Sequence, residues 1–188
     1  DRVTNDILCD KVIIDDQSAA YEAVQSLIDK GRKKIALVTT VDYVSVGKLR
    51  TDGYIKALLD NGISFDENLI IKIEDIDTCE ITIGKLLEDK AIDAVFAVNE
   101  LFAVTIIKTA NKIGLNVPKD LAVIAFTDGM ISKYSTPTIT TVSQNGIKMG
   151  NKSAKMLIER LESEENEEDE NYKTEIIETH LIERESTN

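Results

Sequence analysis

Apolar residues along this chain fall into two patterns: short uninterrupted runs, and longer stretches in which they recur every three or four positions. The runs are typical of strands covered on both faces of a parallel sheet, and the longer stretches are typical of helices with one buried face. Glycines at positions 31, 62 and 114 close three of the longer stretches and supply the left-handed residue that ends a helix. The predicted elements are strand 11–14, helix 18–30, strand 34–40, a helix between Gly47 and Gly62, strand 69–73, helix 79–89, strand 94–98, helix 100–113 and strand 121–126. This alternation predicts an α/β fold with a doubly wound parallel sheet.

The same pattern predicts details of the first two helices. Ser18 stands where an N-cap is expected, so we expect the first helix to begin there. In the second helix we expect the buried face to consist of Leu49, Ile55, Leu58 and Leu59.

Polar residues stand where two of the buried strands stop. Asn99 follows the strand at 94–98, and Thr127-Asp128-Gly129 follows the strand at 121–126. In open parallel sheets, ligands bind beyond the carboxyl ends of the strands. The pattern therefore predicts a ligand site that includes Asn99, Thr127 and Asp128.

The pattern changes after Thr140. Residues 146–161 have an amphipathic spacing that predicts a long helix. Residues 159–171 carry eight acids and one arginine, and such a run is more often a solvated connector than a cation or partner site. The alternation at 173–184 predicts one edge strand at the end of the sheet, with His180 as an exposed residue of that strand.

Net charge and amino-acid composition limit the classes of function that this chain can have. The net charge is −12, from 22 basic and 34 acidic residues, so these residues alone are not expected to bind DNA. No run approaches the roughly 18 apolar residues that cross a bilayer, and the first residues do not resemble a signal peptide. Cys9 and Cys79 lack metal-ligand spacing, which predicts two reduced thiols in a cytoplasmic protein. A single histidine and the lack of phosphate-loop or nucleophile motifs argue against an enzyme, a metal site or a cofactor.

Short segments over nearly the whole chain resemble the effector-binding region of the lactose/galactose repressor family of bacterial transcription regulators. Their common order and spacing carry the resemblance, because each segment is weak alone. The segments are Asp1-Arg2, VIIDD at 12–16, LIDKGRKKIA at 27–36, RTDGY at 50–54, DAVFAVNE at 93–100, VPKDLAVIAF at 117–126, PTITTV at 137–142 and LIERES at 181–186. The resemblance implies the type I periplasmic-binding-protein fold, in which a ligand binds between two lobes.

The resemblance also implies how the chain is divided. Residues 21–142 would form the C-terminal effector-binding lobe, residues 163–171 an acidic connector and residues 172–188 the final strand of that lobe. Residues 1–20 would be a remnant of the N-terminal lobe and crossover, and residues 143–162 a helix that returns to that lobe. Family members carry a helix-turn-helix headpiece and most of the first lobe before the Asp-Arg pair. We therefore expect a fragment whose remnants expose apolar surface.

Four ligand-binding residues are implied by the matched motifs. Arg50, in an Arg-x-x-Gly motif in the first turn of a helix, resembles the arginine that grips effector hydroxyls or a carboxylate; the alternative is a surface salt bridge to Asp52 or its neighbours. Asn99 suits a polyol ring, or caps the helix that follows, or does both. Thr127 stands where the family has the first aspartate of Gly-Phe-Asp-Asp. Either the effector is less hydroxylated, or Asp128 takes over the role of that aspartate, or effector binding is reduced.

Three further residues are candidates by position. Asp1 matches a cleft aspartate of the other lobe, and Tyr43 and Glu74 lie in loops that would reach the cleft. Gln144 lies at the lobe crossover, where a hinge residue and a ligand contact are equal alternatives. Glu100 stands where the family usually has aspartate.

The function implied by the resemblance is that of a cytoplasmic regulator whose lobes close on a sugar or related metabolite. Operator DNA would be bound only through the headpiece that is absent here, and neither a membrane nor a cofactor is expected. A periplasmic sugar-binding protein of an ABC transporter, with the same fold, is the alternative. Family members pair through both lobes, so we expect a homodimer, with the apolar faces of the helices at 79–89 and 100–113 as candidate contacts.

Overall fold

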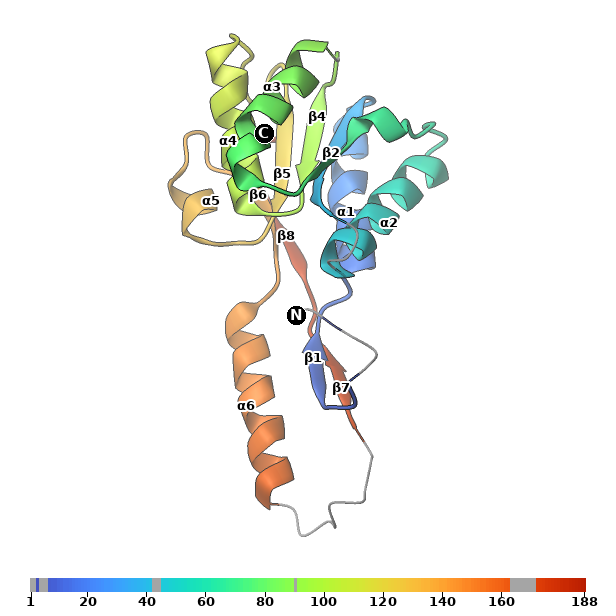
Figure 1. The fold of residues 1–188 in the computed structure, drawn as a ribbon, viewed down its shortest axis with the longest axis vertical. Helices are drawn as coiled ribbons and strands as arrows, with labels where there is room; N and C mark the ends of the chain where they lie inside the picture. Colours follow the sequence, from blue (N-terminus) through green and yellow to red (C-terminus); the bar gives the residue numbers. More distant parts are fainter. Residues whose placement is uncertain (1–2, 4–6, 42–44, 90, 163–171) are drawn as a thin grey trace.

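The computed structural model describes residues 3, 7–41, 45–89, 91–162 and 172–188. Asp1, Tyr43 and the acidic connector at 163–171 lie outside the described residues. The chain forms an α/β body of three layers, from which a narrow extension projects at one end (Figure 1).

A six-stranded sheet is the middle layer of the body, in the order β3-β2-β4-β5-β6-β8. Every residue of the central strands β4 and β5 is buried, as predicted for strands covered on both faces. All neighbouring pairs are parallel except β6 and β8, so the predicted parallel sheet is confirmed. The strands are β2 (Ile35–Thr40), β3 (Ile70–Ile73), β4 (Ala94–Ala97), β5 (Ala122–Phe126), β6 (Thr140–Ser143) and β8 (His180–Ile182).

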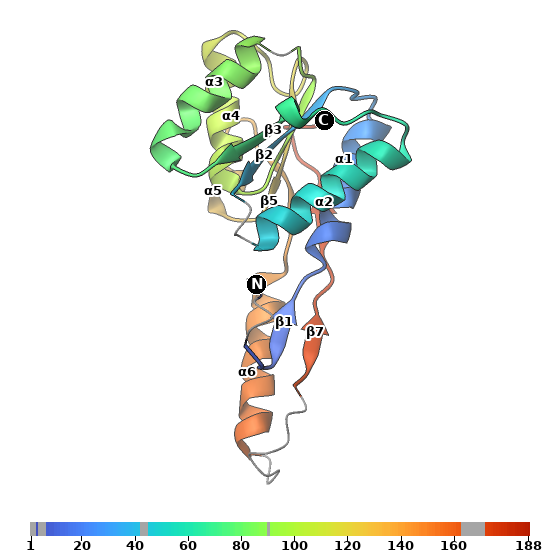
Figure 2. The ribbon, with the colours of Figure 1, turned by 45° about the vertical axis from the view of Figure 1, so that its right-hand side comes forward.

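Helices cover both faces of the sheet, as Figures 1 and 2 show. One face carries α1 (Asp16–Asp29) and α2 (Ser45–Asp60), and the other carries α3 (Cys79–Asp89) and α4 (Glu100–Lys112). Glycines 31, 62 and 114 have φ angles of 85°, 70° and 83°, so they stop α1, α2 and α4 as predicted. Shorter helices are η1 (Glu67–Leu69), η2 (Ile76–Thr78) and α5 (Met130–Tyr134).

The first two helices differ from the prediction in detail. Asp15, and not Ser18, caps α1, because its carboxylate accepts hydrogen bonds from the backbone N of Ser18 at 2.9 Å and from its hydroxyl at 2.7 Å. In α2, Leu49 is 38% exposed and Leu59 is 55% exposed. The helix instead turns the side that contains Gly53 toward α1.

Strand β6 is a polar strand, and the hydrophobic pattern does not predict it. Its threonines are buried because their hydroxyl groups find partners inside the protein. Thr140 Oγ1 lies 2.7 Å from Thr187 Oγ1 and donates to the carbonyl of Arg184, and Thr141 Oγ1 accepts from the Arg184 guanidinium at 2.9 Å. These contacts with the C-terminal residues therefore help to hold β6 in the sheet.

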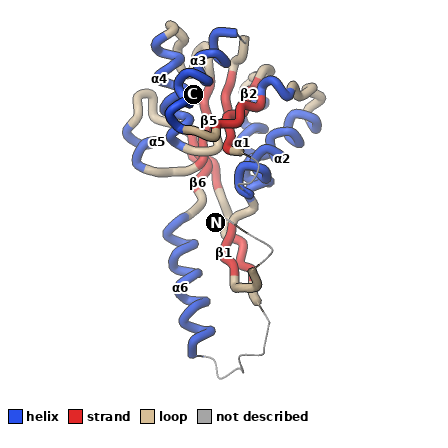
Figure 3. The backbone as a smooth tube through the Cα atoms, viewed as in Figure 1, coloured by secondary structure: helices blue, strands red, loops and turns tan. Residues whose placement is uncertain are grey.

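The extension consists of a separate two-stranded sheet and a long helix, seen below the body in Figure 3. β1 (Lys11–Ile13) pairs in parallel with β7 (Thr174–Ile176), and α6 (Gly146–Glu162) runs beside β1. The prediction of one edge strand at 173–184 is therefore wrong, because β7 belongs to this small sheet and only β8, with exposed His180, extends the large one. The strand predicted at 11–14 also lies outside the large sheet.

Apolar residues of α6 remain exposed. Ile147, Leu157, Ile158 and Leu161 are 85%, 59%, 53% and 76% exposed, and Met156 is the buried residue of the helix. The expected apolar surface is therefore present on this segment.

Candidate functional site

A cavity of about 420 Å³ opens at the carboxyl ends of four parallel strands, β2, β4, β5 and β6. Each strand brings one polar residue to it, at its last position or just beyond: Thr40, Asn99, Thr127 and Gln144. This is the position at which open parallel sheets bind ligands. The rest of the lining consists of Val46, Arg50, Val98, Glu100, Leu101, Phe126 and Ile131.

Arg50 reaches the cavity from the second turn of α2 and is 5% exposed. Its Nε and Nη2 atoms each lie 2.7 Å from Oδ1 of Asp16, and its Nη1 donates to the carbonyl of Val98 at 2.7 Å. The guanidinium carbon also lies 3.7 Å from the ring centroid of Phe126. The alternative of a surface salt bridge to Asp52 or its neighbours is therefore wrong, because Arg50 makes a buried pair with Asp16.

Burial dominates the ionisation of this pair. It lowers the pKa of Arg50 and raises the pKa of Asp16, and the attraction between the two partners offsets part of each shift. Two charges removed from water carry a desolvation cost, so loss of either partner would leave the other charge uncompensated in the interior.

Gly53 allows the pair to form, because it brings α2 against α1. A Cβ atom at this position would lie 2.2 Å from the carbonyl oxygen of Gln17 and 2.9 Å from Cβ of Ala20. The glycine of the Arg-x-x-Gly motif thus has a packing role, which places Arg50 within reach of Asp16 on α1.

Asn99 and Glu100 organise the loop after β4. Asn99 Oδ1 accepts a hydrogen bond from the backbone N of Phe102 at 2.8 Å, so Asn99 caps α4, which is one of the two roles that the sequence predicts for it. Its side-chain amide nitrogen is the group left for a ligand. Glu100 Oε1 accepts from the backbone N of Gly129 at 2.8 Å and of Ser132 at 2.9 Å. Glu100 therefore joins the loop after β4 to the start of α5.

Thr127 lines the cavity, whereas its neighbour Asp128 lies on the wall of a separate hollow. Asp128 binds Arg184 at 2.5 Å and Lys133 at 3.1 Å. Burial by itself would raise the pKa of Asp128, but the hydrogen bonds from Arg184 and Lys133 together lower it below its usual value. Asp128 is thus held by internal ion pairs, which disfavours the idea that it takes over the role of the missing aspartate.

Two polar atoms at the cavity are buried without a hydrogen-bond partner among the described residues. They are Oγ1 of Thr40 and Nε2 of Gln144. Buried polar groups in folded proteins are nearly always hydrogen-bonded, so these two atoms are candidates for contacts with a bound molecule. Thr40 was not among the residues expected from the sequence, and applying the strand-end rule to β2 would have found it.

Of the remaining candidates, Glu74 does not join this site. Glu74 is exposed beyond β3, at the edge of the sheet, and does not line the cavity. Asp1 and Tyr43 lie outside the described residues. Asp16, the partner of Arg50, is a site residue that the sequence pattern does not single out.

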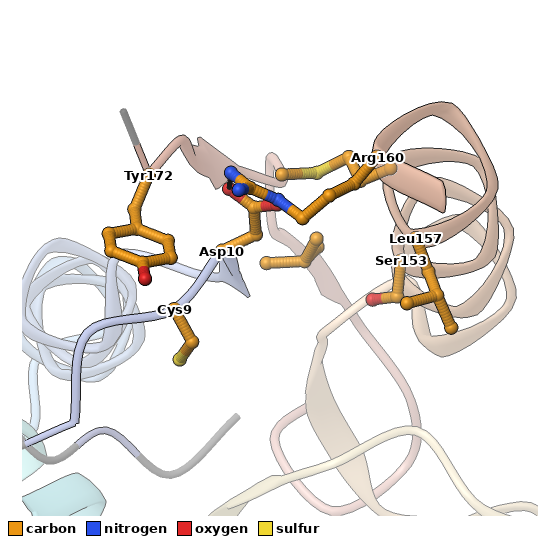
Figure 4. A pocket seen from close by; sticks show the side chains of 8 residues that line it. Cys9, Asp10, Ser153, Leu157, Arg160 and Tyr172 are labelled. Carbon is orange, nitrogen blue, oxygen red and sulfur yellow. Dashed lines mark hydrogen bonds and ion pairs between the residues drawn. The ribbon is translucent and has the colours of Figure 1, made fainter. Parts of the chain in front are cut away.

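A second cavity, of about 280 Å³, lies between α6 and β1 and has Val12, Met156 and Leu157 among its walls. Figure 4 shows Arg160 reaching from α6 toward Asp10, with contacts of 2.6 and 2.9 Å. The hydrogen bond from Arg160 is the main reason why the pKa of Asp10 lies below its usual value. The cavity at the strand ends is the better candidate for a metabolite site, because polar side chains from four strands meet there.

Among the residues whose placement is described, His, Cys, Asp and Glu do not gather in any group of three or more that could hold a metal ion. In the same part of the chain, none of the helices has both the length and the apolar character required to cross a bilayer.

Comparison with known proteins places this geometry in a family. Residues 24–187 match the family described as periplasmic binding protein-like domain. The regulator MalR of Clostridium butyricum is 39% identical over 177 residues, which are 92% of this chain and 51% of MalR. The solved complex of the transcriptional regulator CelR with cellobiose superposes with a TM-score of 0.86 at 30% identity, over 95% of this chain and 54% of that one. The transcription regulator CcpA of Lactococcus lactis gives a TM-score of 0.87 at 27% identity, over 100% of this chain and 68% of that one.

These relatives are transcriptional regulators, which are not enzymes, and they do not favour the alternative of a transport protein. The chain spans about half the length of MalR, at 51%. The chain belongs to the periplasmic-binding-protein-like domain family and is an effector-binding region of the LacI type found in transcriptional regulators.

Proposed function

We propose that this chain binds a small polar metabolite, a sugar or a related compound, in the cavity at the carboxyl ends of β2, β4, β5 and β6. Binding would control the attachment of a cytoplasmic regulator to its operator through a DNA-binding headpiece outside this sequence. The observation that carries the proposal is the convergence of Thr40, Asn99, Thr127 and Gln144 from four strands, with two polar atoms that have no partner within the described part of the chain.

The chemistry of the lining supports a sugar. Hydroxyl and amide groups both donate and accept hydrogen bonds, as a sugar hydroxyl does, and the exposed apolar side chains Leu101 and Ile131 offer surface for the faces of a ring. The CelR structure that this chain resembles is a complex with cellobiose.

The test is calorimetric titration of a panel of neutral sugars, with glucose, maltose and cellobiose as first members, against the wild-type chain and the variants Thr40→Val and Gln144→Leu. Each variant removes a polar atom that has no partner among the described residues, so the fold loses no described hydrogen bond. A neutral hydrogen bond to a ligand contributes about 0.5–1.5 kcal/mol, so we expect each variant to weaken sugar binding by up to about tenfold.

Thr109→Val is the matched control. Its hydroxyl is also buried without a partner among the described residues, but it belongs to α4 and does not line the cavity. It should leave the affinity unchanged. Equal affinity of the wild-type chain, Thr40→Val and Gln144→Leu for a bound sugar would sink the site assignment.

A further inference from the structure

No basic side chain among the described residues that line the cavity is left without an acidic partner. Within the described lining, Arg50 is the one basic residue and Glu100 the one acidic residue. Asp16 lies behind Arg50 and pairs with it, so these three side chains sum to one net negative charge. An anionic ligand gains affinity from uncompensated positive charge and loses it beside like charge.

Asp16 also fixes the orientation of the Arg50 guanidinium at the cavity. Its Oδ1 accepts from Nε and Nη2 of Arg50, and the Val98 carbonyl accepts from Nη1. A guanidinium has five N–H bonds, so one on each Nη atom remains for a ligand. Asp16 is 4% exposed and Arg50 is 5% exposed, which means that solvent screens their interaction little.

We propose that Asp16 is a specificity-determining residue of this site, which acts through Arg50: by neutralising the guanidinium it restricts the cavity to uncharged effectors and excludes metabolites that carry a phosphate or carboxylate. The inference rests on the proposed function, because it assumes that the cavity receives a metabolite. Asp16 does not line the cavity itself, so its role is to position and to neutralise Arg50.

The decisive variant is Asp16→Asn. It keeps an oxygen acceptor near the position of Oδ1 but leaves Arg50 as a net cation, whereas Arg50→Ala would leave the carboxylate buried without its partner. The probes are inorganic phosphate and glucose 6-phosphate, with glucose as the uncharged counterpart. Binding is followed on the Nε–Hε resonance of Arg50 in a 15N NMR titration of the 188-residue chain, which reports binding at this site and not elsewhere.

We expect no saturable shift of this resonance with either anion in the wild-type chain. Asp16→Asn should gain saturable binding of both anions, tighter than any wild-type binding by about tenfold or more, because the freed charge makes charge-assisted hydrogen bonds. Affinity for glucose should change less than affinity for glucose 6-phosphate.

Two control variants separate this effect from a change in total charge. Asp16→Asn combined with Arg50→Gln restores neutrality at the pair and should abolish the gain in anion binding. Because this double variant lacks the Arg50 resonance, its anion binding is compared with that of Asp16→Asn by calorimetric titration. Asp60→Asn changes the net charge equally at the exposed end of α2, and it should leave anion binding at the wild-type level.

Saturable phosphate binding at Arg50 in the wild-type chain overturns the inference, and this measurement decides the matter even if Asp16→Asn fails to fold. A folded Asp16→Asn chain that gains no anion binding also overturns it. If no neutral sugar binds the wild-type chain while the anion gain occurs, the proposed function fails and the role of Asp16 stands. If sugars bind and the gain is absent, only the inference about Asp16 fails.

Discussion

Single residues around the cavity divide into those bound to other parts of the protein and those left for a ligand. Arg50, Glu100 and Asp128 carry charge, and each is engaged by protein groups. Thr40 and Gln144 are neutral, and each presents a buried atom without a partner among the described residues. Under the proposed function, we therefore expect the neutral groups to contribute most of the ligand contacts, while the described charges are engaged inside the protein.

The ion pairs of Asp128 make a pH-dependent contribution to stability. Because the folded-state pKa of Asp128 lies below the usual 3.8, these contacts stabilise the fold above that pH and are lost as the pH falls through the lowered pKa. Arg184→Met should raise the pKa of Asp128 and thereby reduce the acid-sensitive part of the free energy of unfolding. The check is a 13C NMR titration of the Asp128 carboxyl carbon.

Lys108→Met is the control for that titration, because Lys108 pairs with Glu80 on an exposed surface formed by α3 and α4. It removes the same charge but should leave the titration of Asp128 unchanged. An unaltered pKa of Asp128 in Arg184→Met would show that the ion pair with Arg184 does not hold this carboxylate ionised.

At the scale of elements, the contact between α1 and α2 supports the site. Arg50 and Gly53 lie on the side of α2 that faces α1, and the Arg50 contact with Asp16 crosses between the two helices. The position of the guanidinium at the cavity thus depends on how closely the helices approach.

Gly53→Ala should therefore destabilise the fold. The new Cβ would lie 2.2 Å from the Gln17 carbonyl oxygen, which is backbone and must move. Overpacking of this kind costs about 1–3 kcal/mol, which should lower the midpoint of urea unfolding. Displacement of α1 should also shift the Nε–Hε resonance of Arg50.

Gly84→Ala is the matched control in α3, where the nearest atom to a new Cβ is Thr109 Cγ2 at 3.9 Å. It should be stabilising by roughly 0.5–1 kcal/mol, because alanine has the higher helix propensity. If both variants have the same stability, the close approach at Gly53 is not needed for the fold.

At the scale of the whole molecule, two of the regions that expose apolar side chains bear on association. One lies on the body and includes Ile81 of α3, Leu101 of α4 and Tyr134 of α5, which are 66%, 45% and 78% exposed. The other is the exposed side of α6. The apolar faces of α3 and α4 are otherwise largely turned inward, so only part of the surface proposed for pairing is accessible.

We expect the chain to form at least a weak homodimer through the surface on α3 and α4. Sedimentation velocity at increasing concentration should show association, and Ile81→Glu, on α3 and away from the cavity lining, should reduce it, because a dimer contact would bury this side chain and a carboxylate there is costly to desolvate. Leu161→Glu, on α6, tests the alternative that the chain associates through α6. A chain that is monomeric at high micromolar concentration would contradict the prediction, and association lost only in Leu161→Glu would assign it to α6.

Local patterns alone predicted most of the elements of this protein. Periodicity identified the buried strands, glycine at the left-handed positions marked three helix ends, and the polar residues after β4 and β5 indicated the edge of the sheet where the cavity lies. These features depend on residues close together in the chain, so the amino-acid sequence by itself determines them.

Only the tertiary structure decided which groups meet. Arg50 and Asp16 are 34 residues apart, and their pairing depends on how α1 packs against α2. The order of strands in the sheet brings Thr40 and Gln144 to one cavity, and the division of residues 173–184 between two sheets depends on which strand edges are open. Long-range packing chooses these partners, because spacing along a chain does not specify which of several polar groups will be nearest once the layers assemble.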